Sequence, residues 1–134
     1  MKKFNKQDYK EFIGKIELYN SEKTNDIDKY LKAAKNYFKI LNTTEDRIEF
    51  IDEILQKSGG DKIRILSEEL AKKTYEKDKN PESYANYIKI LISNKKYNTA
   101  RQHLGIAIKM AEEQRKSDIV RTLKRYERYL QKVE

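Results

Sequence analysis

The charged side chains near the carboxyl-terminal end form a pattern that could bind phosphate. Arg121, Arg125, Arg128 and Lys132 recur at spacings of four, three and four residues, and Lys124 lies beside them. In a helix this spacing gathers them on one face, where their charges could neutralise phosphates and release counterions. Such a face is also common as a solvated helix surface. We call these five residues the basic stripe and predict that it binds nucleic acid or an acidic protein, or is only solvated.

Residues for catalysis or metal binding are scarce. The 134-residue chain contains one histidine, His103, and no cysteine. A lone histidine cannot assemble a histidine-rich metal site, and no serine lies in a recognisable nucleophile turn. The pair Gly59-Gly60 lacks the further glycine and the lysine of a nucleotide-binding loop. We therefore expect a protein that is not an enzyme and that uses no cofactor and no metal.

Composition indicates one folded domain, residues 1–134, with an uneven charge. Hydrophobic residues make up 37% and charged residues 39%, which leaves enough apolar side chains for a core. The net charge is +8; residues 1–60 hold 12 basic and 11 acidic side chains, whereas residues 61–134 hold 18 and 11. The basic excess thus lies in the half of the chain that contains the basic stripe. No secretory signal and no segment of membrane-spanning length is evident, so we expect a cytoplasmic protein that binds no membrane.

The elements that position these residues are expected to be helices. Four glycines and one proline provide too few tight turns for an all-β fold. Apolar residues recur at helical spacing, and polar capping residues separate about seven segments. The first runs over about 6–19 after Asn5, the second follows Asn25, and the third follows Thr43. Later segments follow Gly59-Gly60, Asn80 and the 93–97 turn, and the seventh starts near Ser117.

The apolar faces predict how two of these helices pack. In the first helix we expect Tyr9, Phe12, Ile13 and Ile16 to be buried. The seventh carries a seam with alternating spacings of four and three residues: Ile119, Leu123, Tyr126, Leu130 and Val133. Such an amphipathic terminal helix would cap the last apolar face of a helical repeat protein.

One helix pair carries a recognisable repeat pattern. Aromatic and small residues follow in a fixed order over about residues 81–114: Tyr84, Tyr87, Leu91, Tyr97, Ala100, Leu104 and Ala107. This order resembles one tetratricopeptide repeat. The upstream pairs, residues 6–41 and 44–78, share its hairpin size and apolar rhythm. The resemblance implies an all-α, α-α helical hairpin solenoid of about seven helices with a C-terminal capping helix.

The same resemblance implies a binding groove. The groove positions of the family fall on Ala85, Asn86, Lys89, Ile92 and Ser93. Asn86 could pair with an extended peptide backbone and Lys89 with a carboxylate. The expected function is a non-enzymatic protein–protein interaction or scaffold module that binds a peptide or partner helix in this groove. Two alternatives stay open: a basic nucleic-acid-binding subunit of a larger nucleoprotein complex, and a homo-oligomer.

Overall fold

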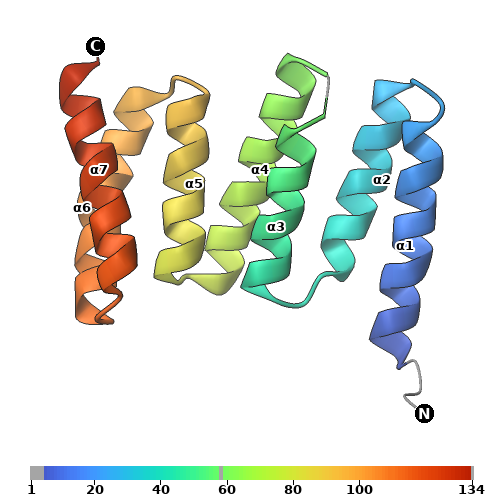
Figure 1. Cartoon of the computed structure of the whole chain (residues 1–134), viewed down its shortest axis with the longest axis horizontal. Coiled ribbons are helices and arrows are strands. Elements are labelled where there is room, and N and C mark those ends of the chain that lie inside the picture. Colours follow the sequence, from blue (N-terminus) through green and yellow to red (C-terminus); the bar gives the residue numbers. More distant parts are fainter. Residues whose placement is uncertain (1–4, 58, 134) are drawn as a thin grey trace. The chain divides into compact units, whose positions relative to one another are not determined.

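The computed structural model describes residues 5–57 and 59–133 and is all-α (Figure 1). Within these residues it has seven helices and no strand, which confirms the predicted fold class. The helices are α1 (Lys6–Glu22), α2 (Ile27–Ile40), α3 (Thr44–Leu55), α4 (Asp61–Asp78), α5 (Pro81–Ser93), α6 (Tyr97–Glu113) and α7 (Ser117–Lys132).

Side-chain caps explain where three helices begin. Asn5 forms a reciprocal capping box with Asp8 at the start of α1. The Thr43 hydroxyl accepts a hydrogen bond from the Asp46 amide, 3.1 Å away, at the start of α3. Asn80 caps α5, whose first residue, Pro81, has no amide hydrogen that needs a partner. These three predicted starts are therefore confirmed.

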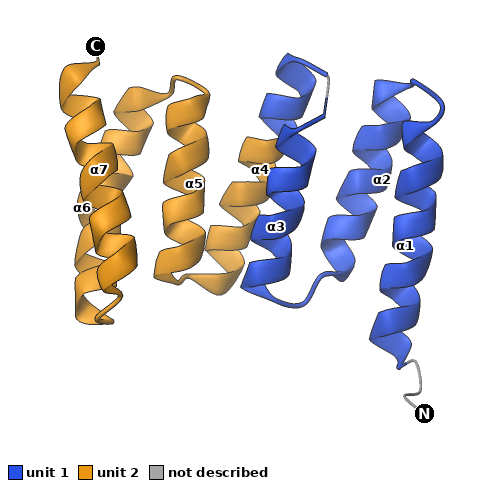
Figure 2. Ribbon diagram, in the orientation of Figure 1, with its two compact units in different colours: residues 1–66 blue, residues 67–134 orange. Residues whose placement is uncertain are grey.

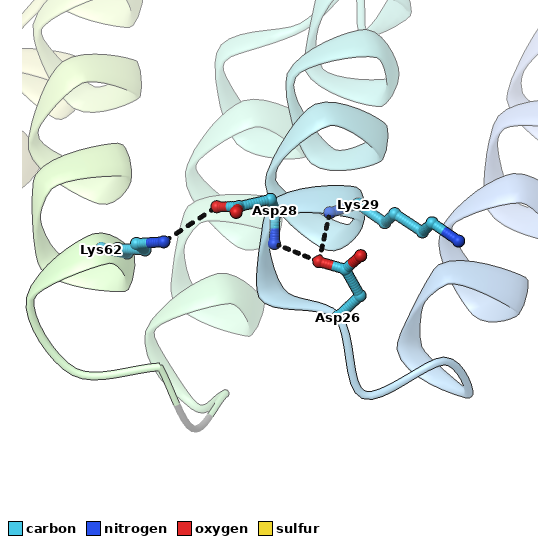
Figure 3. Close-up of polar contacts among 4 residues, drawn as sticks. All are labelled: Asp26, Asp28, Lys29 and Lys62. Atoms are coloured by element: carbon cyan, nitrogen blue, oxygen red, sulfur yellow. Dashed lines mark hydrogen bonds and ion pairs between the residues drawn. The ribbon is translucent and has the colours of Figure 1, made fainter.

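The start of α2 lies one residue later than the sequence suggested (Figure 3). Its cap is Asp26, whose Oδ1 accepts hydrogen bonds from the amides of Asp28 at 3.1 Å and Lys29 at 3.4 Å. Asn25 instead takes a left-handed conformation, with φ of 55°, in the turn before the helix. The ammonium of Lys62, at the start of α4, lies 2.9 Å from the Asp28 carboxylate.

The chain divides into two compact units, one ending at Leu66 and the other beginning at Ser67 (Figure 2). In the first unit α1 packs along α2, and the core includes Ile51, Ile54 and an edge-to-face contact between Tyr37 and Phe50, whose ring centroids are 4.6 Å apart. The buried guanidinium of Arg47 donates to the Leu41 carbonyl, 2.8 Å away, just after α2. This bond provides a partner for a carbonyl at the helix end.

In the second unit α6 packs against both α5 and α7. Alanines 100, 107 and 111 are fully buried on α6, and side chains this small let neighbouring helices approach closely. The predicted seam of α7 is confirmed, since Leu123 and Leu130 are buried and its other members are half-buried. Arg101 on α6 donates to the carbonyls of Leu130 at 2.8 Å and Val133 at 2.7 Å, at the end of α7.

Candidate interaction surfaces

The apolar face of α1 points outward, contrary to the sequence-based prediction. Five large side chains on this helix are exposed, and we call them the α1 stripe: Tyr9, Phe12, Ile13, Ile16 and Tyr19. Tyr9 is 62% exposed, Phe12 54% and Ile16 42%. At about 100° per residue, the five side chains share one side of the helix. The predicted burial of Tyr9, Phe12, Ile13 and Ile16 was therefore wrong.

The physical reason lies on the opposite side of α1, which packs on α2. Leu18 and Ser21 are buried there, and Gln7 donates to the Ile40 carbonyl. Gly14 allows the close approach, because a Cβ atom at this position would lie 2.9 Å from Cδ2 of Tyr37. The side of α1 that faces α2 thus combines Leu18 with glycine and polar residues, and the other large apolar residues remain at the surface.

The charges of α1 are nearly balanced. Between Lys6 and Glu22 the helix carries three lysines, one aspartate and three glutamates, a net charge of −1. Next to the stripe, the Lys23 ammonium lies 4.4 Å from the centroid of the Tyr19 ring, a cation–π contact. The stripe is therefore an apolar surface with a mixed, almost neutral border.

The two predicted groove residues lie in different environments. Asn86 is only 5% exposed, and neither its Oδ1 nor its Nδ2 has a hydrogen-bond partner in the described part of the chain. Lys89, three residues further along α5, is half-buried. An unpaired buried amide is costly, so Asn86 has hydrogen-bonding capacity that the described residues leave unused. Its predicted contact with a peptide remains a prediction.

The five residues of the basic stripe are all exposed on α7. Arg121 lies 3.4 Å from the Asp118 carboxylate, whereas the other four have no ion pair in the described chain: Lys124, Arg125, Arg128 and Lys132. The nearby Tyr129 ring contacts Tyr97 edge to face, with centroids 6.3 Å apart. The interaction with Tyr97 raises the pKa of Tyr129.

A shallow depression of about 710 Å³ adjoins the basic stripe at the turn before α7. Four cationic side chains line it, Arg115, Lys116, Arg121 and Lys124, together with Glu112. Lys116 pairs with the Glu82 carboxylate at 3.1 Å. No side chain of the described residues caps the first amides of α7, and the positive end of a helix dipole favours anions. The local field here therefore favours negatively charged groups.

His103, which the sequence presents as isolated, belongs to an aromatic cluster inside the second unit. Its ring lies edge to face against Tyr84 and Tyr87, with both centroid distances 5.4 Å, and Nδ1 is hydrogen-bonded to the Tyr84 hydroxyl. Tyr75 stacks on Tyr84 at 3.9 Å. Burial, with the charge of Lys72, lowers the pKa of His103. The residue is therefore held neutral in a packing role.

A cavity of about 320 Å³ lies at the turn between α1 and α2, bordered by Ser21, Tyr30 and Lys57 among others. The Tyr30 hydroxyl is buried and has no hydrogen-bond partner among the described residues. Burial, and the charges of Glu22 and Glu53, raise its pKa. Lys57 pairs with Glu22 at 3.1 Å. The cavity therefore offers a neutral hydroxyl donor.

Among the described residues, no three histidine, aspartate or glutamate side chains come together in a way that could hold a metal ion. None of the described helices combines the length and hydrophobicity needed to cross a bilayer.

Comparison with known proteins provided no further guide to function. The chain matched no protein-family model, no curated protein and no solved structure.

Proposed function

We propose that this chain is a non-enzymatic protein-interaction module that binds an amphipathic helix of a protein partner along the α1 stripe. The observation that carries the proposal is the exposure of five large apolar side chains on the side of α1 that faces away from α2. Aromatic residues supply most of this surface, and aromatic residues are enriched at the centres of protein interfaces. The tetratricopeptide-like pattern of residues 81–114 supports the same class of function by analogy.

The spacing of the stripe suits a helix as its occupant. Tyr9, Phe12, Ile16 and Tyr19 follow one another at three, four and three residues, the rhythm by which helix pairs interdigitate. An extended peptide would instead find no sheet edge to extend on α1. The predicted groove around Asn86 and Lys89 is a second place where a peptide could bind.

Photo-crosslinking tests the proposal directly. A photoreactive phenylalanine analogue replaces Ile16, and a matched chain carries it at Ile106, an equally apolar position that is 57% exposed on α6. We expect protein adducts at position 16 that are absent at position 106 and that the added substitution Tyr9→Lys suppresses. Equal adducts at both positions, or none at position 16, would show that the α1 stripe is not the binding surface.

The basic stripe supports a second candidate, the binding of nucleic acid. Its specific observation is that four exposed cations have no carboxylate partner in the described chain. One of them, Lys124, borders the cation-lined depression at the start of α7. Each phosphate contact made by such side chains adds to the salt dependence of binding.

Titration with labelled single- and double-stranded DNA and RNA at two salt concentrations tests this candidate. If it is correct, the double variant Arg125→Glu, Arg128→Glu weakens binding at least about tenfold and flattens its salt dependence. The control is Lys32→Glu, an exposed lysine on α2, with a second charge reversal at Lys39 to match the net charge. If no binding is seen at low salt, or if both double variants lose it equally, the basic stripe is only solvated.

A further inference from the structure

We infer that the helix bound by the α1 stripe is α1 of a second copy of this chain, in an antiparallel and symmetric pair. This inference rests on the proposed function, because it names the partner of the same surface. A symmetric contact requires a surface that complements itself. An apolar stripe along a single straight helix meets that requirement when it packs against its own copy.

The exposed area is sufficient for a weak dimer. Aromatic side chains present about 150–250 Å² each, and the three in the stripe are 62%, 54% and 57% exposed. Together with Ile13 and Ile16, the stripe offers roughly 500 Å² per copy, near the upper end for patches on monomers. The methylene groups of the flanking lysine and glutamate side chains add to this area, so that the area buried per copy approaches the ~800 Å² per partner of a standard interface.

Charge favours a protein partner over a phosphate-bearing surface. An anionic lipid surface or nucleic acid selects an excess of lysine and arginine, whereas α1 has a net charge of −1. Lys10 and Glu17 lie two helical turns apart on the same edge of the stripe. When α1 of a second copy runs antiparallel to the first and the two stripes are centred on each other, Lys10 of each copy lies opposite Glu17 of the other.

The other terminal helix makes a head-to-tail contact unfavourable. The exposed side of α7 carries the basic stripe, four of whose cations have no ion pair in the described chain. Packing those cations against Tyr9, Phe12 and Ile16 would remove them from water without a partner charge. Pairing α1 with α1 avoids this cost and closes the assembly at two copies.

Sedimentation equilibrium of the full chain over about 5 to 500 µM measures the association. We expect a shift from 16.1 kDa toward twice that mass. Ile16→Lys and Tyr9→Lys should each weaken association at least about tenfold, whereas Ile106→Lys should not. Circular dichroism and urea unfolding show that each variant is folded. A monomer mass throughout, or equal association of the stripe variants and the control, overturns the inference.

Cysteine crosslinking tests the antiparallel orientation without background, because the chain has no cysteine. An oxidised mixture of Tyr9→Cys and Tyr19→Cys should form the mixed dimer in preference to either self-dimer, and Ile106→Cys should form little. Preferred self-dimers of both variants would overturn the antiparallel pair.

The two proposals fail in different ways. A purified chain that stays monomeric, while position 16 crosslinks to a different protein, overturns self-pairing and leaves the interaction module standing. Absence of any adduct at position 16, from this chain or another protein, overturns both.

Discussion

At the residue scale, the neutral form of His103 contributes to stability. Its folded-state pKa lies below 6.5, because burial and Lys72 disfavour the charged ring. As pH falls through 6.5, the unfolded chain therefore binds this proton before the folded chain does, and the free energy of unfolding decreases. One proton limits the slope to about 1.4 kcal/mol per pH unit. Urea unfolding at pH 7.5, 6.5 and 5.5 measures it.

The variant His103→Gln provides the control, since an amide does not titrate in this range. Its stability should be lower at pH 7.5, where the Tyr84 contact is altered, but should change less between pH 7.5 and pH 5.5. A variant with the same pH slope as the original chain would show that other groups cause the dependence.

Asn86 provides a second prediction at this scale. Replacing it with leucine removes a buried amide that has no partner among the described residues, so Asn86→Leu should raise the free energy of unfolding by about 1–2 kcal/mol. Asn36→Leu, at an exposed position inside α2, measures the part due to helix propensity alone. A loss of stability at position 86 beyond that control would indicate that ordered water satisfies the amide.

At the scale of helices, two glycines with different surroundings test the packing of α1. Gly105 lies inside α6 with open space where a Cβ atom would be, so Gly105→Ala should stabilise the chain by about 0.5–1 kcal/mol. At Gly14 the new Cβ would lie 2.9 Å from the Tyr37 ring and 3.0 Å from Cδ1 of Ile40. Gly14→Ala should therefore destabilise by about 1 kcal/mol despite its better propensity. Thermal and urea unfolding of both variants measure the contrast.

Helix positions were predictable from the sequence because neighbouring residues determine them. The side chains of Asn5, Thr43 and Asn80 each accept a hydrogen bond from the backbone amide three residues further along. Their capping therefore does not depend on distant contacts. The apolar seam of α7 was predictable for a similar reason, since its spacing leaves one continuous apolar side.

The side of α1 that packs on α2 could not be predicted in the same way. Apolar residues are usually buried, and that rule placed Tyr9 and Phe12 inside. The alternative signal was Gly14 with Leu18 and Ser21 on the other side, which permits a closer approach to α2. Only the positions of Tyr37 and Ile40 show that this side is the one that packs. The aromatic cluster around His103 was missed similarly, because its members come from three separate helices.

At the scale of the whole molecule, salt should separate the two candidate surfaces. Packing of the α1 stripe depends on apolar burial, which added salt leaves intact or strengthens, whereas phosphate binding by the basic stripe weakens steeply with salt. Raising sodium chloride from about 50 mM to about 500 mM should therefore leave self-association within about twofold and reduce any nucleic-acid affinity by more than about tenfold.

The same assembly should make thermal stability depend on concentration. A dimer of folded chains stabilises the folded state by mass action, so the midpoint of unfolding should rise by a few degrees over a hundredfold increase in chain concentration. Calorimetry at about 5 and 500 µM measures the rise in the original chain, in Tyr9→Lys and in Ile106→Lys. The rise should vanish only in Tyr9→Lys, because its lysine would place a charge within the apolar contact. A midpoint independent of concentration in the original chain would mean that the α1 stripe does not pair with its own copy in this range.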